Sequence, residues 1–185
     1  LLSTHTRITA LRADKLLGLS LKPYSQSSKI PHLVSVPPLI RKEITALKSK
    51  KTTPHFLLIY LTQLVDIKPI ITSKQLGNGI DIHLFICDTL RVQLERETLP
   101  ARFRFHAIHP THFLEKMSQC SGLITTAGFE SIAEAMYLQK PVLTIPISGH
   151  YEQMCNAIDA EQSGAGLHMK KPDIASFLAY ISTRN

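Results

Sequence analysis

The residues best suited to chemistry lie in one continuous run, from Gly128 to Ala157. Just before it, the apolar residues 122–124 lead into a small-residue turn at 125–128, and an amphipathic helix pattern follows. A strand that ends in such a turn and opens a helix points backbone N–H groups outward at the positive end of the helix dipole. This arrangement suits the binding of a phosphate group.

A second polar loop follows in the same run. Residues 141–146 have the pattern of a strand, and the loop after them ends in Glu152 and Gln153 as another helix begins. In an open α/β sheet, loops that follow parallel strands lie on one rim, where such sheets bind ligands. Two polar loops on one rim predict a ligand that carries a diphosphate and has a polar group at its far end.

At these residues the chain resembles the donor-binding half of GT-B glycosyltransferases, in particular the branch of the lipid-II-forming N-acetylglucosaminyltransferase and the UDP-glycosyltransferases. The resemblance is sharp over residues 123–166. It implies a nucleotide-diphospho-sugar as donor, with UDP as the expected nucleotide, and no cofactor besides. In one departure, many members carry His or a second Gly before the phosphate-loop Gly, where this chain has Thr126-Ala127.

The resemblance also implies roles for individual residues. Gly128 and Ser131 would hold the donor diphosphate, and Glu134 would accept the ribose hydroxyls. The Glu152-Gln153 pair, followed by Asn156-Ala157, would read the donor sugar. The nucleotide base would pack on His109 and Pro110. With residues that border the two loops and the domain crossing, the candidate set for the diphosphate is Thr62, Ala127, Gly128, Phe129, Ser131 and Arg41.

Several of these residues have a second interpretation. Thr62 ends an apolar strand and either touches a phosphate or forms a plain turn, and His150 either contacts the diphosphate or donor sugar or forms part of a helix N-terminus. Glu134 is either a ligand residue or an ordinary helix residue that faces solvent or forms a salt bridge.

The histidines at 106, 109 and 112 have a spacing that would align them on a helix, as metal ligands can be. Pro110 and the strand before it favour a strand followed by a loop instead. Alternate strand residues point to opposite faces, so we expect the three imidazoles to diverge. No metal site is predicted, and no catalytic residue is assigned.

Charge and cysteine content limit the class of partner and compartment. A formal net charge of +7 and a pI near 9.4 fit an anionic partner such as a nucleotide-sugar or an acidic membrane face. The only dense basic run is 48–51 and no aromatic residues are interleaved with it, so nucleic acid is not expected. Three widely spaced cysteines without a CxxC pair favour a reducing compartment. With no apolar run of membrane-spanning length, we expect a cytoplasmic protein, and peripheral membrane contact stays open.

Strand and helix patterns alternate along the chain, which predicts a Rossmann-like α/β domain with a doubly wound parallel sheet, one half of a GT-B architecture. The predicted strands cover residues 56–61, 80–86, 103–108, 122–124, 141–146 and 165–169. The predicted helices include residues 67–76, the segments around 113–120 and 132–136, and residues 151–162 and 172–181. An additional short strand is expected within 14–21.

The first part of the chain differs in character from the rest. Residues 34–38 form an extended connector, because each proline disfavours helix in the residue before it. The resemblance places a domain crossing here, with Arg41 just beyond it. We therefore divide the chain into residues 1–36, a remnant of the N-terminal acceptor domain with its crossing linker, and residues 37–185, the C-terminal nucleotide-sugar-binding domain.

The predicted function is donor recognition in the transfer of a sugar to an unknown acceptor, with inversion at the anomeric carbon. The length suits one domain of a two-domain enzyme, and the chain starts with Leu, so we expect a missing N-terminal domain or a partner subunit. The alternatives are a nucleotide-sugar 2-epimerase or hydrolase of the same architecture, which needs further acid/base carboxylates, and a non-catalytic donor-binding subunit of a split glycosyltransferase.

Overall fold

The computed structural model describes residues 13–22, 33–47, 56–62, 64–72, 79–95 and 99–184. The chain forms two compact units, Leu1–Leu39 and Ile40–Asn185. In the described part of the first unit, β1 (Leu16–Leu19) pairs in parallel with β2 (Leu33–Val36), which confirms the short strand expected within 14–21. The assignment of residues 1–36 to an acceptor domain stays a prediction, and residues 1–12 and 23–32 of it lie outside the described residues.

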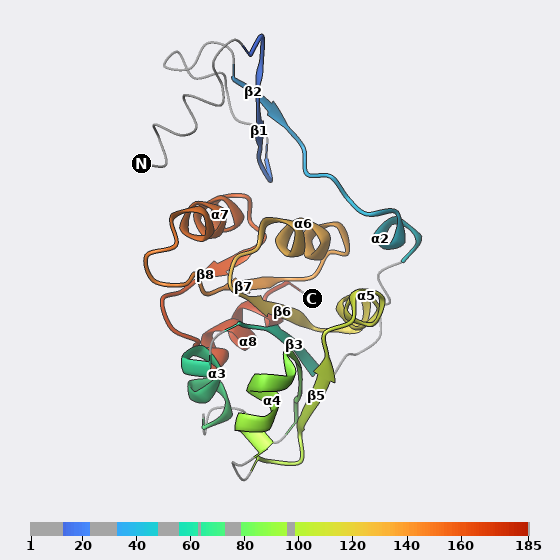
Figure 1. Cartoon of the computed structure of the whole chain (residues 1–185), viewed down its shortest axis with the longest axis vertical. Helices are drawn as coiled ribbons and strands as arrows, with labels where there is room; N and C mark the ends of the chain where they lie inside the picture. The colour runs from blue at the N-terminus through green and yellow to red at the C-terminus, as the bar shows by residue number, and fades with distance from the viewer. Residues whose placement is uncertain are drawn as a thin grey trace. The chain divides into compact units, whose positions relative to one another are not determined.

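The second unit is built on a six-stranded parallel sheet with strand order β5-β4-β3-β6-β7-β8 (Figure 1). Its strands are β3 (Phe56–Tyr60), β4 (Asp81–Ile86), β5 (Phe103–Ala107), β6 (Gly122–Thr125), β7 (Val142–Thr144) and β8 (Gly166–His168). The predicted strands are confirmed: β6 is one residue longer than predicted, and the other five are shorter at one or both ends. Strand β5 lies at one edge of the sheet.

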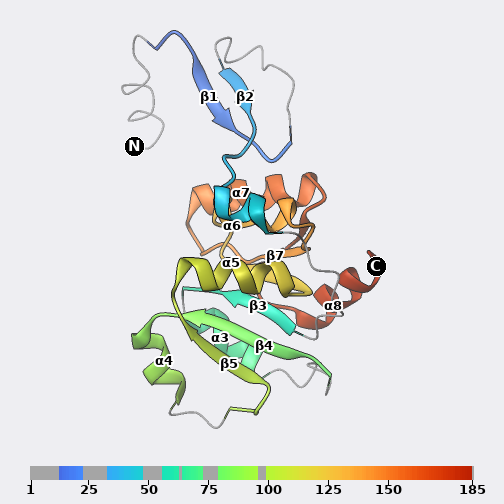
Figure 2. The same cartoon turned by 90° about the vertical axis from the view of Figure 1, so that its right-hand side faces the viewer.

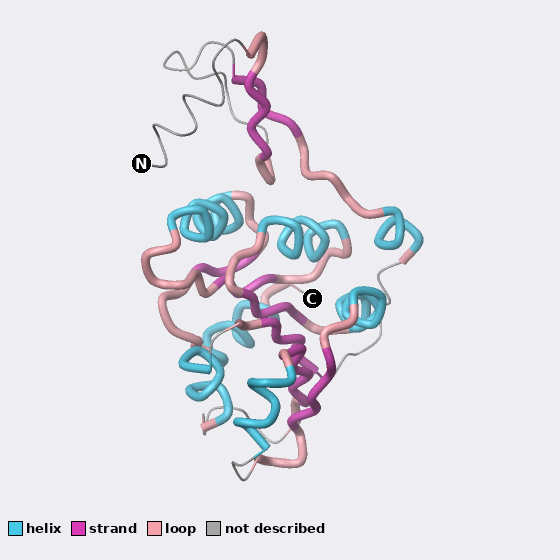
Figure 3. The backbone as a smooth tube through the Cα atoms, viewed as in Figure 1, coloured by secondary structure: helices cyan, strands magenta, loops and turns pink. Residues whose placement is uncertain are grey.

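Helices cover both faces of this sheet, which confirms the doubly wound α/β fold (Figures 2 and 3). They are α2 (Lys42–Ala46), α3 (Leu64–Ile71), α4 (Asp88–Glu95), α5 (Pro110–Gln119), α6 (Phe129–Tyr137), α7 (Tyr151–Gln162) and α8 (Ile174–Ser182). The last helix approaches β6 so closely that a Cβ on Gly122 would lie 2.8 Å from the Phe177 ring, so packing requires glycine there. Of the described helices, none has the length and apolar character to cross a bilayer.

The starts of helices α3 and α8 differ from the sequence prediction. Helix α3 begins at Leu64 and contains Pro69, because the buried Ile67 and Ile70 anchor it to the core and outweigh the hydrogen bond that the proline removes. Residues 73–76, the rest of that predicted helix, lie outside the described residues. Helix α8 begins at Ile174 because Asp173 caps it, accepting from the backbone N–H of Ser176 at 3.1 Å. Helices α2 and α4 were not predicted.

An aromatic and histidine cluster lies between β4, β5 and α5. The ring of His106 is 4.9 Å from that of His112 and stacks at 4.8 Å on Phe85, and its Nε2 lies 3.0 Å from Nδ1 of His83. The prediction that the imidazoles of 106 and 112 diverge is therefore wrong. Pro110 starts α5 directly after β5, and the helix carries His112 back over the strand. The described residues nevertheless contain no group of three or more His, Cys, Asp or Glu side chains able to hold a metal ion.

Burial keeps His83 and His106 neutral. Desolvation lowers the pKa of His83 to about 4, and the neighbouring His106, Lys116 and Arg104 act in the same direction against a weaker opposing effect of Asp81. Desolvation also lowers the pKa of His106 to about 4, with His112, Lys116 and Arg104 contributing. Each histidine is thus harder to protonate in the folded protein than in the unfolded chain.

We predict that acid weakens the fold before the carboxylates titrate. Because both folded pKa values lie below the ordinary value of 6.5, the unfolded chain takes up protons that the folded protein does not as the pH falls through about 6.5. The free energy of unfolding should therefore decrease by roughly 1–3 kcal/mol between pH 7 and pH 5, after allowance for the partial exposure of His106. Urea denaturation at a series of pH values measures this decrease.

The variant His83→Leu should flatten the decrease. The control Phe56→Leu alters packing against the same histidine, whose ring lies 4.2 Å from the Phe56 ring, without removing a proton site. It should lower stability equally at every pH. An unfolding free energy that is constant from pH 7 to pH 5 in the unmodified protein would contradict the prediction.

Candidate functional site

The sheet has one point at which the chain reverses its direction of travel. From β3 the chain moves outward through β4 to β5, and it then returns to β6 on the other side of β3 and moves outward again through β7 to β8. In such sheets, ligands bind in the crevice outside the carboxyl ends of the strands at this switch point. Tyr60 of β3 pairs with Thr125 of β6, so the exposed Thr62 and the turn 126–128 both follow directly at the crevice.

The turn after β6 exposes the start of α6. Gly128 is the N-cap of that helix, is exposed to solvent, and has no side chain with which to cap it. The first backbone N–H groups of a helix have no acceptor within the helix, so those of Phe129, Glu130 and Ser131 are available to an outside acceptor. A Cβ built on Gly128 would lie 3.9 Å from Oγ of the half-buried Ser131, which places the hydroxyl on the same side of the turn.

The residue before Gly128 holds the turn in an uncommon backbone conformation. Ala127 has a φ of 66°, in the left-handed region that favours glycine, and is fully buried. Its carbonyl oxygen accepts a hydrogen bond from Nδ2 of Asn156 on α7 at 3.0 Å. The resemblance groups Asn156 with the sugar-reading residues, and in the structure its amide braces the turn before Gly128. Its sequence position alone gives no sign of this contact with Ala127.

Glu134 and Arg41 form an ion pair. Both oxygens of the Glu134 carboxylate accept hydrogen bonds from the guanidinium, Oε1 from Nε at 2.5 Å and Oε2 from the terminal nitrogen at 2.7 Å. The Glu134 side chain is only 1% exposed, whereas that of Arg41 is 41% exposed. The structure thus joins the predicted ribose residue to a predicted diphosphate residue, and their roles toward a ligand stay predictions.

Residues of the second loop hold its backbone in place. Nδ1 of His150 accepts from the backbone N–H of Gln153 at 3.3 Å and so caps α7, while Oε1 of Gln153 accepts from the backbone N–H of Ile147 at 2.9 Å. The helix-terminus interpretation of His150 is therefore what the structure shows. Glu152 is exposed in the first turn of α7. The contacts of all three residues with a donor sugar stay predictions.

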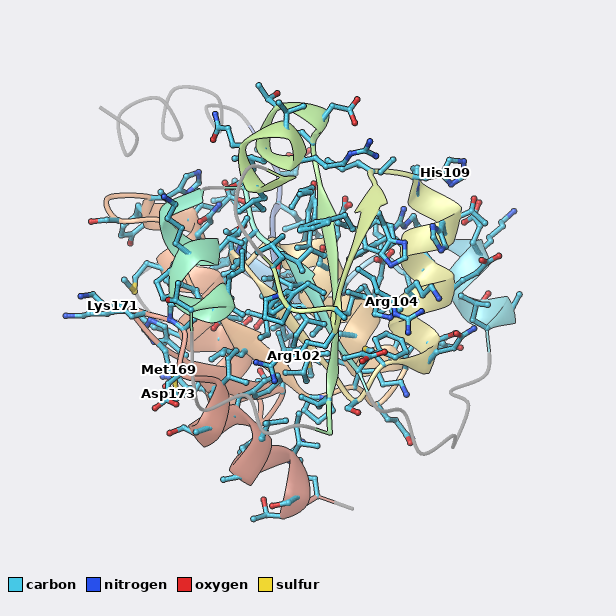
Figure 4. All side chains as sticks on the ribbon, turned by 90° about the horizontal axis from the view of Figure 1, so that it is seen from below. Arg102, Arg104, His109, Met169, Lys171 and Asp173 are labelled. Carbon is cyan, nitrogen blue, oxygen red and sulfur yellow. The ribbon has the colours of Figure 1, made fainter. Side chains whose placement is uncertain are left out.

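The residues predicted to meet the base lie on the same rim of the sheet but at its edge. His109 and Pro110 are exposed at the start of α5, beyond the tip of β5 (Figure 4). Nδ1 of His109 caps that helix by accepting from the backbone N–H of His112 at 3.4 Å. Their role in base binding stays a prediction.

Asn156→Ala should destabilise the domain, because the buried carbonyl of Ala127 would lose its side-chain donor in a turn that is already conformationally unfavourable. We expect a decrease of roughly 1–2 kcal/mol in the free energy of unfolding, measured by urea denaturation. The control Ser182→Ala removes an exposed bond of similar kind, from Oγ to the carbonyl of Ala179 at 2.7 Å, and should cost far less. Equal losses for the two variants would show that Asn156 has no special role in the turn.

A known protein family matches this sequence, and several solved structures share its fold. Residues 22–182 match the family model described as Glycosyl transferase family 1. No curated protein matches the sequence. Among solved structures, the glycotransferase of kitacinnamycin is 15% identical, with a TM-score of 0.60 over 85% of this chain and 42% of that one.

Two further structures hold nucleotides. The glycosyltransferase SsfS6 of Streptomyces sp. SF2575, complexed with thymidine diphosphate, is 14% identical with a TM-score of 0.56, over 90% of this chain and 44% of that one. The glycosyltransferase LpCGTa in complex with UDP is 16% identical with a TM-score of 0.53, over 83% of this chain and 39% of that one.

This chain therefore spans less than half the length of each of these structures. At such low identity they establish the fold alone, the Rossmann-like half of a GT-B architecture, as the sequence predicts. The family model matches most of the chain. The protein belongs to glycosyl transferase family 1.

Proposed function

We propose that this chain is the donor-binding part of a glycosyltransferase that takes a sugar from a nucleoside-diphosphate sugar. The observation that carries the proposal is the open N-terminus of α6 at the switch point, with exposed Gly128 and the Ser131 hydroxyl on one side of the turn. Helix N-termini of this kind bind phosphates. The nucleoside diphosphates held by SsfS6 and LpCGTa, which share the fold, support the same ligand class.

The turn and α6 would act mainly on the leaving group. As the bond between the anomeric carbon and the diphosphate breaks, negative charge grows on the diphosphate oxygens. Backbone N–H groups at 129–131, the helix dipole, the Ser131 hydroxyl and the Arg41 guanidinium would stabilise that charge without a metal ion. Inversion and deprotonation of the acceptor would rely on groups outside the residues assigned here, from an acceptor domain or subunit.

Glu134 and the second loop would select the rest of the donor. A carboxylate accepts two ribose hydroxyls well, and Glu134 lies on the helix that would hold the diphosphate. The Gln153 oxygen is engaged with Ile147, which leaves the amide N–H groups of its side chain to donate to sugar hydroxyls. His109 and Pro110 would pack against the base.

The first test is binding of a nucleoside diphosphate. UDP or thymidine diphosphate should bind the chain and raise its melting temperature, and Gly128→Val should abolish binding while the domain stays folded. Gly128 has a φ of −66°, which any residue adopts, and the space near Ser131 admits a Cβ, so the added side chain obstructs the ligand rather than the fold. Calorimetry and thermal denaturation measure both effects.

The matched control is Gly79→Val, at a turn where a Cβ would meet no atom within 4 Å. This variant should bind as the unmodified protein does. If neither nucleotide binds the unmodified chain at millimolar concentration, the donor-binding proposal fails.

The second test concerns the sugar. Gln153→Ala should weaken UDP-glucose or UDP-N-acetylglucosamine by about tenfold relative to UDP, the size of one or two lost hydrogen bonds. Gln153→Glu keeps an oxygen acceptor for the Ile147 N–H while removing the amide donors, and its added charge affects UDP and UDP-sugar alike. The ratio of the two dissociation constants should therefore change in both variants. A change in the alanine variant alone would mean that loop shape, not the amide, selects the sugar.

A further inference from the structure

The Arg41 side chain shields the carboxylate of Glu134 from solvent. Glu134 is 1% exposed and both its oxygens contact the guanidinium, while Arg41 itself is 41% exposed. Arg41 precedes α2, which lies beside α6 in both views of the ribbon (Figures 1 and 2). A ligand hydroxyl can therefore replace the guanidinium at the Glu134 oxygens only if the Arg41 side chain moves.

Acidic side chains around Arg41 hold its guanidinium in this position. The hydrogen bonds to Glu134 are the largest cause that raises the pKa of Arg41, and the charges of Glu134, Glu130 and Glu43 add to it. Breaking a buried ion pair without replacing the lost partner is unfavourable, because the carboxylate keeps its charge in a poorly hydrated place. A ligand that opens the pair must supply a new anion for Arg41.

A diphosphate at the start of α6 is such an anion. Gly128 and Glu134 are separated by about 9 Å along the helix axis, at 1.5 Å per residue, so the guanidinium would have to swing along α6 to reach a diphosphate at its start. Ribose hydroxyls would then replace the guanidinium as donors to Glu134, while the guanidinium binds phosphate oxygens. A nucleoside without phosphates offers Arg41 nothing in exchange.

We propose that Arg41 is a positioning residue that pairs with Glu134 until the donor binds and then moves to its diphosphate, so that ribose recognition depends on the diphosphate. The inference rests on the proposed function and deepens it, because it makes Arg41 the residue by which the site rejects free nucleosides. The preference for the nucleoside diphosphate over the nucleoside would then come from exchange of one ion pair for another rather than from two independent contacts.

The experiment compares UDP with uridine, or thymidine diphosphate with thymidine if that nucleotide binds more tightly. The readout is the nucleoside dissociation constant divided by the nucleoside-diphosphate dissociation constant, measured by titration followed by NMR. In Arg41→Ala, the nucleoside should bind at least as well as in the unmodified protein, because Glu134 is uncovered and hydrated. The diphosphate should bind about tenfold more weakly, so the ratio falls.

Glu134→Gln should change the ratio in the opposite direction. Both ligands lose affinity to a weaker ribose acceptor, but Arg41 is released to the diphosphate at no cost, so the ratio rises. Arg41→Lys keeps the charge without the two-pronged geometry and should lie between Arg41→Ala and the unmodified protein. The matched control is Arg104→Ala, an exposed arginine paired with Asp81 at 3.0 Å towards the opposite end of β5 from His109 (Figure 4), which should leave the ratio unchanged.

The outcomes separate the inference from the proposed function. If the unmodified chain binds no nucleoside diphosphate, the proposed function fails and the inference fails with it. If UDP binds but the ratio moves in the same direction in Arg41→Ala and Glu134→Gln, the pair is only structural and the inference alone is overturned. An unchanged ratio in Arg41→Ala also overturns the inference. Should Arg41→Ala not fold, Glu134→Gln provides the test, because that variant leaves Arg41 intact.

Discussion

The pairing of β3 with β6 is the constraint on which the rest of the site depends. These two strands meet where the chain reverses its direction through the sheet, and residues 57–59 and 122–125 in them are buried. A shift of register by one residue would exchange the side chains on the two buried faces and put a larger residue where Gly122 meets Phe177, so close packing fixes the register. Fixed register in turn determines where each strand ends. The exposed Thr62 and the turn that leads to Gly128 are therefore placed at one crevice by core packing, before any ligand contributes.

The polar side chains at this crevice form hydrogen bonds and ion pairs with other protein groups. The residues that do so are those that the resemblance assigns to the donor. His150 and His109 each cap a helix, Gln153 holds the loop backbone at Ile147, and Arg41 pairs with Glu134. These contacts do not compete equally with a ligand. The caps and the Gln153 oxygen can persist, because each leaves other atoms of the side chain available, whereas the Arg41–Glu134 pair occupies both carboxylate oxygens. Of these contacts, only the ion pair has to open for a ligand to reach the carboxylate.

Patterns local in sequence were enough to predict most of the fold. Continuous apolar runs such as 56–61 identified buried strands, and the small-residue turn before Gly128 located the open helix start. Helix α4 was missed although Leu90 and Leu94 lie one turn apart, because its exposed residues give a weak pattern. Contacts between distant segments were beyond such reasoning. The Arg41–Glu134 pair spans 93 residues, and the contact of His106 with His112 depends on how sharply α5 turns back after Pro110.

The charges close to the crevice, rather than the net charge of +7 of the whole chain, determine which ligands the crevice favours. Charges farther away than a Debye length, about 8 Å at physiological ionic strength, are largely screened at the crevice. The first turns of α6 and α7 carry Glu130 and Glu152, which are favourable beside the helix dipoles but repel a diphosphate. Against them stand the free N–H groups of α6 and the guanidinium of Arg41. Of these groups, the guanidinium is engaged by Glu134, so in our proposal it reaches the anion only when the ion pair opens.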